Sequence, residues 1–212
     1  MRLATRGLSF GALLTCLVLS SITAGAADDE GFVKLFNGKN LDGFAFVLAK
    51  KDADPSKTWM VKDGVIHCTG KPNGYFHTKK SFRNYILRLD FRYPEKAGNS
   101  GYLIHISGPH KVWPKCIEVQ GHYNSVCSIF AIGGAKGERP PVDKKALEKA
   151  RKPHTEWNTV QIVSKDGMLT SYLNGVKICA NKTPYELKEG PIGFQSEGVP
   201  IEFRNIMIKE LK

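Results

Sequence analysis

Residues 85–93 read Tyr-Ile-Leu-Arg-Leu-Asp-Phe-Arg-Tyr, and the alternation of apolar and polar side chains in this stretch decides the fold class. Successive side chains of a β-strand point to opposite faces of a sheet. One face of this strand would therefore be entirely apolar, made of Tyr85, Leu87, Leu89, Phe91 and Tyr93. Such a pattern predicts a strand with one side packed on a core.

Turn signals separate this strand from others. Asp63-Gly64, Asp166-Gly167 and Asn174-Gly175 each lie between two β-type runs, and such pairs favour two-residue hairpin turns. The last two turns predict a three-stranded meander from Trp157 to Ala180. Many short strands between turns predict an all-β domain, a jelly-roll β-sandwich of two antiparallel sheets.

Two segments depart from regular alternation. The apolar positions of residues 201–208 change parity, which predicts a β-bulge near Arg204-Asn205. Residues 142–152 have a short helical pattern, with Asp143 as the N-cap and Pro153 after the end. We expect this helix to be an insertion on a loop.

The first 26 residues read as a signal peptide. Arg2 and Arg6 precede an apolar run from Leu8 to Ile22, and Ala24-Gly25-Ala26 fits the small-residue cleavage pattern. The apolar run is too short for a comfortable membrane span, so we expect no transmembrane segment in the mature chain. The expected organisation is a signal peptide at 1–26 and a single domain at 27–212, in a protein exported to the periplasm or secreted.

Mass spectrometry of the exported protein should therefore find an N-terminus near Ala27. The physical reason is that signal peptidase cuts after small residues that follow the apolar run. An intact Met1 terminus on a cytosolic protein would contradict this expectation.

Charge and cysteine content narrow the classes of function. Removing Arg2 and Arg6 lowers the formal net charge from +11 to +9. The densest basic segment, 144–152, has no interleaved aromatic residues, so we expect a solvated surface and no nucleic-acid partner. The expected mature chain keeps Cys68, Cys116, Cys127 and Cys179, which permit two disulfides in three connectivities, or else buried free thiols.

Residues 116–122, Cys-Ile-Glu-Val-Gln-Gly-His, mark the candidate site. Alternation would place Glu118, Gln120 and His122 on one sheet face, with Ile117 and Val119 opposed in the core. A carboxylate, an amide and an imidazole on one face suit a polar site in the concave sheet of such a sandwich. The alternative is an ordinary solvent-exposed face.

Several segments, in order along the chain, resemble the 3-keto-disaccharide hydrolase family. These are residues 35–44, 59–66, 99–102, 118–120, 156–158, 173–175, 190–195 and 203–206, and the resemblance extends from about Gly31 to Leu211. It implies a concanavalin A-like lectin/glucanase jelly roll. It also implies an exported enzyme that acts on carbohydrate, namely glycosides whose sugar carries a ketone at C3.

The implied chemistry needs one base. Two-carboxylate hydrolysis would lack a second carboxylate unless Glu156 or Glu197 reaches the site. A C3 ketone acidifies the C2 proton, so one base can start a β-elimination that water then completes. Candidate bases are Glu118, His105 and His122. Candidate donors to sugar hydroxyls or to the enolate are Gln120, Asn99, Gln195 and Arg204.

A divalent cation could replace these donors as the Lewis acid. The spacing of the six histidines includes no HxH or HExxH pattern, so no metal ligand is predicted.

The chain also differs from relatives at presumed site positions. His105 stands where they often carry arginine, His122 follows a strand after which an aspartate is common, and Glu197 stands where they often carry histidine.

Two other functions fit the same fold. A non-catalytic, lectin-like carbohydrate-binding module would stack sugars on exposed aromatic rings, for which Trp113 is the best candidate beside Tyr102 and Tyr123. A structural or adhesion module is the third reading. A pocket lined by Glu118 and Gln120 would favour the enzyme, and a shallow aromatic groove would favour binding.

Overall fold

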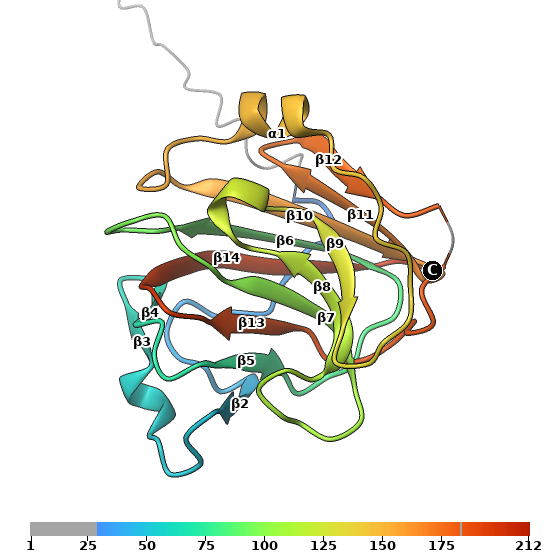
Figure 1. The fold of residues 1–212 in the computed structure, drawn as a ribbon. Coiled ribbons are helices and arrows are strands. Elements are labelled where there is room, and N and C mark those ends of the chain that lie inside the picture. Colours follow the sequence, from blue (N-terminus) through green and yellow to red (C-terminus); the bar gives the residue numbers. More distant parts are fainter. Residues whose placement is uncertain (1–28, 183) are drawn as a thin grey trace, which may run out of the picture. The chain divides into compact units, whose positions relative to one another are not determined.

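Two antiparallel β-sheets face each other between Gly31 and Lys212 (Figure 1). The structure is a computed structural model that describes residues 29–182 and 184–212, so the expected signal peptide lies outside the described residues. The eight-stranded sheet has the order β12-β11-β10-β6-β14-β4-β3, with β1 paired to β14. The six-stranded sheet has the order β2-β5-β13-β7-β8-β9.

The strands of the eight-stranded sheet are β1 (Val33–Lys34), β3 (Trp59–Lys62), β4 (Val65–Cys68), β6 (Tyr85–Arg92), β10 (Asn158–Lys165), β11 (Met168–Leu173), β12 (Val176–Ala180) and β14 (Ile201–Glu210). Those of the six-stranded sheet are β2 (Phe44–Leu48), β5 (Gly74–Thr78), β7 (Gly101–Ser107), β8 (Lys115–Gln120), β9 (Ile129–Ile132) and β13 (Gly193–Ser196). The helical segments are α1 (Lys144–Ala150) and two 3₁₀ turns, Pro55–Lys57 and Tyr123–Ser125.

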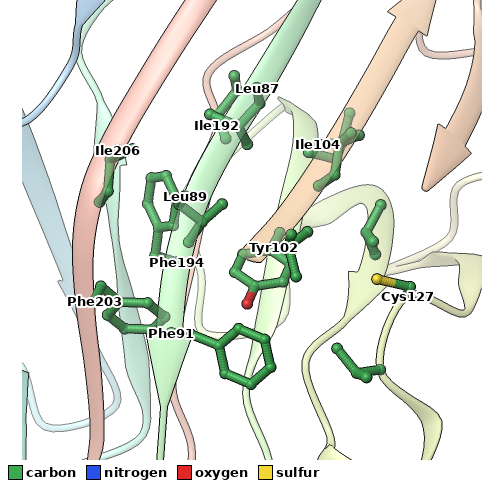
Figure 2. Close-up of a cluster of buried hydrophobic side chains, with 14 of the residues drawn as sticks. Leu87, Leu89, Phe91, Tyr102, Ile104, Cys127, Ile192, Phe194, Phe203 and Ile206 are labelled. Atoms are coloured by element: carbon green, nitrogen blue, oxygen red, sulfur yellow. The ribbon is translucent and has the colours of Figure 1, made fainter. Parts of the chain in front are cut away.

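The core lies between the two sheets. Residues of β6 alternate between buried and partly exposed, as its sequence predicts. Phe194 of the six-stranded sheet stacks on Phe76, with ring centroids 4.8 Å apart, and meets Phe203 of the eight-stranded sheet edge-on at 6.2 Å. Figure 2 shows Phe194 and Phe203 in this core. Aromatic packing therefore joins the sheet that carries the candidate site to the sheet behind it.

The predicted hairpin turns are confirmed. Asp63, Asp166 and Asn174 have positive φ, and so has the glycine that follows each of them. Positive φ at both central residues is the geometry of the type I′ turn that joins neighbouring strands. The meander β10-β11-β12 is confirmed with it.

The predicted bulge in β14 is also confirmed. The pairing of β14 with β6 shifts register between Arg204 and Met207, and Asn205 has φ of 52°. The shift lets Phe203 and Ile206 both enter the core, although they are three residues apart.

The predicted helix is present as α1. The Asp143 carboxylate accepts a hydrogen bond from the Ala146 N–H at 2.9 Å, which caps the first turn. Leu147 is the buried residue of this helix.

Among the described residues, no helix combines the length and the apolar character required to span a membrane.

The sequence left open whether the cysteines form disulfides or remain buried free thiols. In the structure Cys68, Cys116, Cys127 and Cys179 are all buried free thiols. Cys127 belongs to the core between the sheets, whereas Cys116 belongs to a small apolar cluster on the other face of the six-stranded sheet. Their close spacing in sequence therefore does not make them partners.

Candidate functional site

The face of the six-stranded sheet turned away from the core, called here the outer face, carries the candidate site. Ile117 and Val119 are fully buried between the sheets, so alternation along β8 turns Glu118 to the outer face, as predicted. Glu118 lies opposite Leu103 of β7 and opposite Phe130 of β9. A carboxylate therefore sits on rigid sheet, on a strand that is paired on both sides.

Gly101 of β7 makes room for two side chains. A Cβ atom at this position would lie 2.6 Å from Glu118 Oε1 and would also overlap Gln195 Oε1. The carboxylate of Glu118 and the amide of Gln195 therefore converge over the bare backbone of Gly101. This close approach requires glycine.

The Gln195 amide is buried without a partner. Its residue is 1% exposed, and neither Oε1 nor Nε2 has a hydrogen-bond partner among the described residues. A buried polar group left unpaired costs about 1–3 kcal/mol. An amide kept in this state beside a carboxylate is suited to bind a polar ligand, and the sequence already nominated Gln195 for that role.

The electrostatic environment of Glu118 suits proton transfer near neutral pH. Burial, and then repulsion by Glu197, raises the pKa of Glu118 to about 7. Among the residues that the structure describes, none donates a hydrogen bond to this carboxylate or forms a salt bridge with it. A general base works best when its pKa lies near the operating pH.

A second carboxylate reaches the outer face, which the sequence left undecided. Glu197 is half-buried just beyond β13 and pairs with Asn99 in an isolated bridge. Burial raises the pKa of Glu197, and a hydrogen bond from the Asn99 side chain opposes this rise. Glu156, the other candidate, is exposed in the loop before β10.

Three further polar residues of the outer face were missed by sequence reasoning. The Tyr75 hydroxyl lies 3.1 Å from His110 Nδ1, and the His77 and His110 rings stack with centroids 4.4 Å apart. Burial lowers the pKa of His77. Every residue of β5 is buried, so its sequence has no alternation that would assign Tyr75 and His77 to a face.

His122 was expected on the strand of Glu118, but it lies beyond the end of that strand, where alternation does not assign it to a face. β8 ends at Gln120, and His122 stands directly before the 3₁₀ turn Tyr123–Ser125 as its N-cap residue. The His122 backbone N–H donates to Gln120 Oε1 at 2.8 Å. Gln120 keeps its place beside Gly101, but its side-chain oxygen is used to fix this turn.

His105 lies in the interior, away from Glu118. A bulge between Ile104 and Ser107 gives His105 a φ of 57° and reverses its direction relative to simple alternation. Its Nδ1 bonds the Leu187 carbonyl at 3.0 Å, and its ring meets Tyr85 of the opposite sheet edge-on. Burial lowers the pKa of His105.

Arg204 and Trp113 lie outside the strands that carry Glu118 and Gln195. Arg204 is on the eight-stranded sheet, where it pairs with Asp90 at 3.1 Å and lies 4.1 Å from the Trp157 ring centroid. It stands at the bulge of β14, so the structure does not bring it together with Glu118, Gln195 and the other nominated donors of the six-stranded sheet. Trp113 is 44% exposed in the loop between β7 and β8.

A hollow of about 720 Å³ lies elsewhere on the domain. Phe44, Phe46, Pro55 and Trp59 line it with polar residues of the 39–42 segment. Its lining includes Trp59, whose buried Nε1 also has no hydrogen-bond partner among the described residues. Across the described ranges, no group of three or more His, Cys, Asp or Glu side chains is placed to hold a metal ion, so the residues present do not define a cation site.

The comparisons with known proteins agree with this architecture. Residues 31–209 match the model of the 3-keto-alpha-glucoside-1,2-lyase-like domain. A 3-keto-disaccharide hydrolase of Bacteroides thetaiotaomicron is 25% identical, over 87% of this chain and 80% of its own length.

Solved structures give the same fold. A candidate glycosyl hydrolase from Parabacteroides distasonis superposes with a TM-score of 0.65 at 23% identity, over 87% of this chain and 96% of its own. A carbohydrate-binding module from Bacillus subtilis gives 0.57 at 12% identity, over 79% and 96%. The Bacillus licheniformis β-glucanase gives 0.54 at 9% identity, over 85% and 97%. The predicted lectin/glucanase jelly roll is thus confirmed.

Proposed function

This chain belongs to the family of 3-keto-α-glucoside-1,2-lyase-like domains, and from this premise we propose that it is a glycosyl hydrolase that cleaves 3-keto-glycosides. The observation that carries the proposal is the buried Glu118 carboxylate, with its pKa raised to about 7, beside the unpartnered amide of Gln195. The name of the Bacteroides relative supports the substrate class.

The proposed reaction begins at C2 of the sugar. The C3 ketone acidifies the C2 proton, and Glu118 removes it as general base. The electron pair moves into an enolate, and the glycosidic oxygen then leaves C1 to give an unsaturated sugar. Water adds at C1 and the proton returns to C2, so the net reaction is hydrolysis.

The amides of the outer face are proposed to hold the substrate. Gln195 Nε2 is a buried donor without a partner among the described residues, and its amide lies beside Glu118 over Gly101. A donor aimed at the enolate oxygen stabilises charge that develops in the transition state. Asn99 and Gln120 lie on the same face and are assigned to sugar hydroxyls.

A screen of sugars tests this function. The protein should cleave 3-keto-glucosides and act poorly on the corresponding ordinary glucosides, because without the ketone the C2 proton is not acidic. Equal cleavage of ordinary glucosides would contradict the elimination and favour two-carboxylate hydrolysis. Parallel assays with EDTA, and with added divalent cations, decide whether a metal ion takes part.

The same screen addresses the alternative of a carbohydrate-binding module. In that case the protein would bind sugar without cleaving it, and Trp113→Ala would weaken binding.

We also propose that the protein acts outside the cytoplasm, in the periplasm or as a secreted protein, on the basis of the signal-peptide pattern in residues 1–26.

A further inference from the structure

Glu197 is held firmly, although it lies just beyond the end of β13. Its bridge to Asn99 continues the register in which Phe194 pairs with Tyr102. The N–H of the next residue, Gly198, donates to the Gly70 carbonyl at 2.7 Å. Backbone contacts on both sides therefore fix the position from which the Glu197 side chain extends.

The outer face is arranged in the order Glu118, Gln195, Glu197. Gln195 precedes Glu197 by two residues and shares its face, and its Oε1 converges with Glu118 Oε1 over Gly101. The Gln195 amide is 1% exposed and unpartnered within the described residues, and so is the buried Asn99 Oδ1. Unpaired buried groups beside two carboxyl groups leave hydrogen-bonding capacity that a polar ligand can satisfy.

We propose that Glu197 is the second carboxyl group of this site and acts as the acid that protonates the leaving group. This inference rests on the proposed function. Glu118 takes the proton from C2, and the carboxylic acid of Glu197 gives its proton to the glycosidic oxygen as the C1–O bond breaks. In the second half, the Glu197 carboxylate takes a proton from the water that adds at C1, and Glu118 returns its proton to C2. Both groups end in their starting states.

Repulsion between the two groups makes them share a proton. Burial raises the pKa of both carboxyl groups, and the charge of Glu197 raises that of Glu118 further. Two close carboxylates resist double ionisation, so the pair retains one proton into the neutral range, and its apparent pKa values belong to the pair.

Other ionisable groups surround the pair. Those on or over the outer face, or in contact with its strands, are Tyr75, His77, His110, Cys116, Arg139 over the Phe130 ring, and Tyr93 near Glu197. Burial raises the pKa of the Tyr75 hydroxyl and the Cys116 thiol, so neither is charged at neutral pH. A bell-shaped dependence of kcat/KM on pH is therefore expected to arise from the two carboxyl groups.

The test compares Glu197→Gln with the wild type on two substrates, methyl 3-keto-glucoside and p-nitrophenyl 3-keto-glucoside, as both anomers. Loss of a general acid lowers the rate by about 10²–10⁴-fold, and we expect this loss with the methyl substrate. The p-nitrophenolate leaves without protonation, so its cleavage should fall far less. Glu95→Gln, an exposed glutamate of the β6–β7 loop, is the matched control.

The pH profile gives a second readout that a purely structural role would not change. Glu197→Gln removes the group whose ionisation ends the activity at high pH. The falling limb of kcat/KM should therefore disappear, while the rising limb, which reports the ionisation of Glu118, should remain. Full activity of Glu197→Gln on the methyl substrate, or an equal loss on both substrates, would overturn the inference while leaving the proposed function in place. A wild type inactive on every 3-keto substrate would overturn both.

Discussion

Glu118→Gln is expected to lower the turnover of a 3-keto-glycoside by about 10²–10⁴-fold, the usual contribution of a positioned general base. Glutamine keeps the shape of the side chain over Gly101 but cannot accept the C2 proton. The substitution also removes the repulsion between two partly buried carboxyl groups, so the melting temperature should not fall. Initial rates and thermal unfolding of the purified variant measure both effects.

The control for this experiment is Glu148→Gln, which changes the same kind of side chain at an exposed position of α1. It should leave both rate and stability unaltered. If Glu118→Gln keeps full activity, Glu118 is not the base. The next candidates on the outer face are then His77 and His110, whereas His105 is buried on the core side of the sheet.

Phe194→Ala is expected to lower the free energy of unfolding by about 3–5 kcal/mol, the usual cost of truncating a buried phenylalanine. Phe194 is completely buried and contacts rings from both sheets. The loss would leave a cavity directly beneath Gln195, so activity should decline as well. Urea denaturation measures this change. The slope of the free energy of unfolding against urea concentration should be the same for the variant and the wild type if both unfold in two states.

Val33→Ala serves as the comparison for stability. Val33 is 58% exposed on the short strand β1, and surface changes usually stay within about 0.5 kcal/mol. A Phe194→Ala variant as stable as Val33→Ala would show that the aromatic cluster does not hold the two sheets together.

Local patterns in the sequence were sufficient for the strands and turns. The period-two alternation of β6, the Asp-Gly and Asn-Gly turns, the capped helix α1 and the bulge in β14 were all predicted. Each depends on residues adjacent in the chain, because backbone geometry and solvent exposure repeat over short distances. The face occupied by Glu118 followed from the same rule.

The alternation of side chains failed to predict which face a residue occupies where the backbone left regular strand geometry or where both faces of a strand were buried. The bulge at His105 reverses a side chain that alternation would place on the outer face. β8 ends at Gln120, before His122, which leads into the 3₁₀ turn Tyr123–Ser125. In β5 burial on both sides removes the contrast between polar and apolar positions, so Tyr75 and His77 carried no signal.

The sequence by itself therefore determined the fold class, the strand that carries Glu118 and the direction in which Glu118 points. Only the tertiary structure decided its neighbours. Gln195 and Glu197 join Glu118 through the register of β13 against β7, and Arg204 leaves the set because β14 belongs to the other sheet. Side-chain direction is set by adjacent residues, whereas register and sheet membership are set by packing between segments distant in the chain.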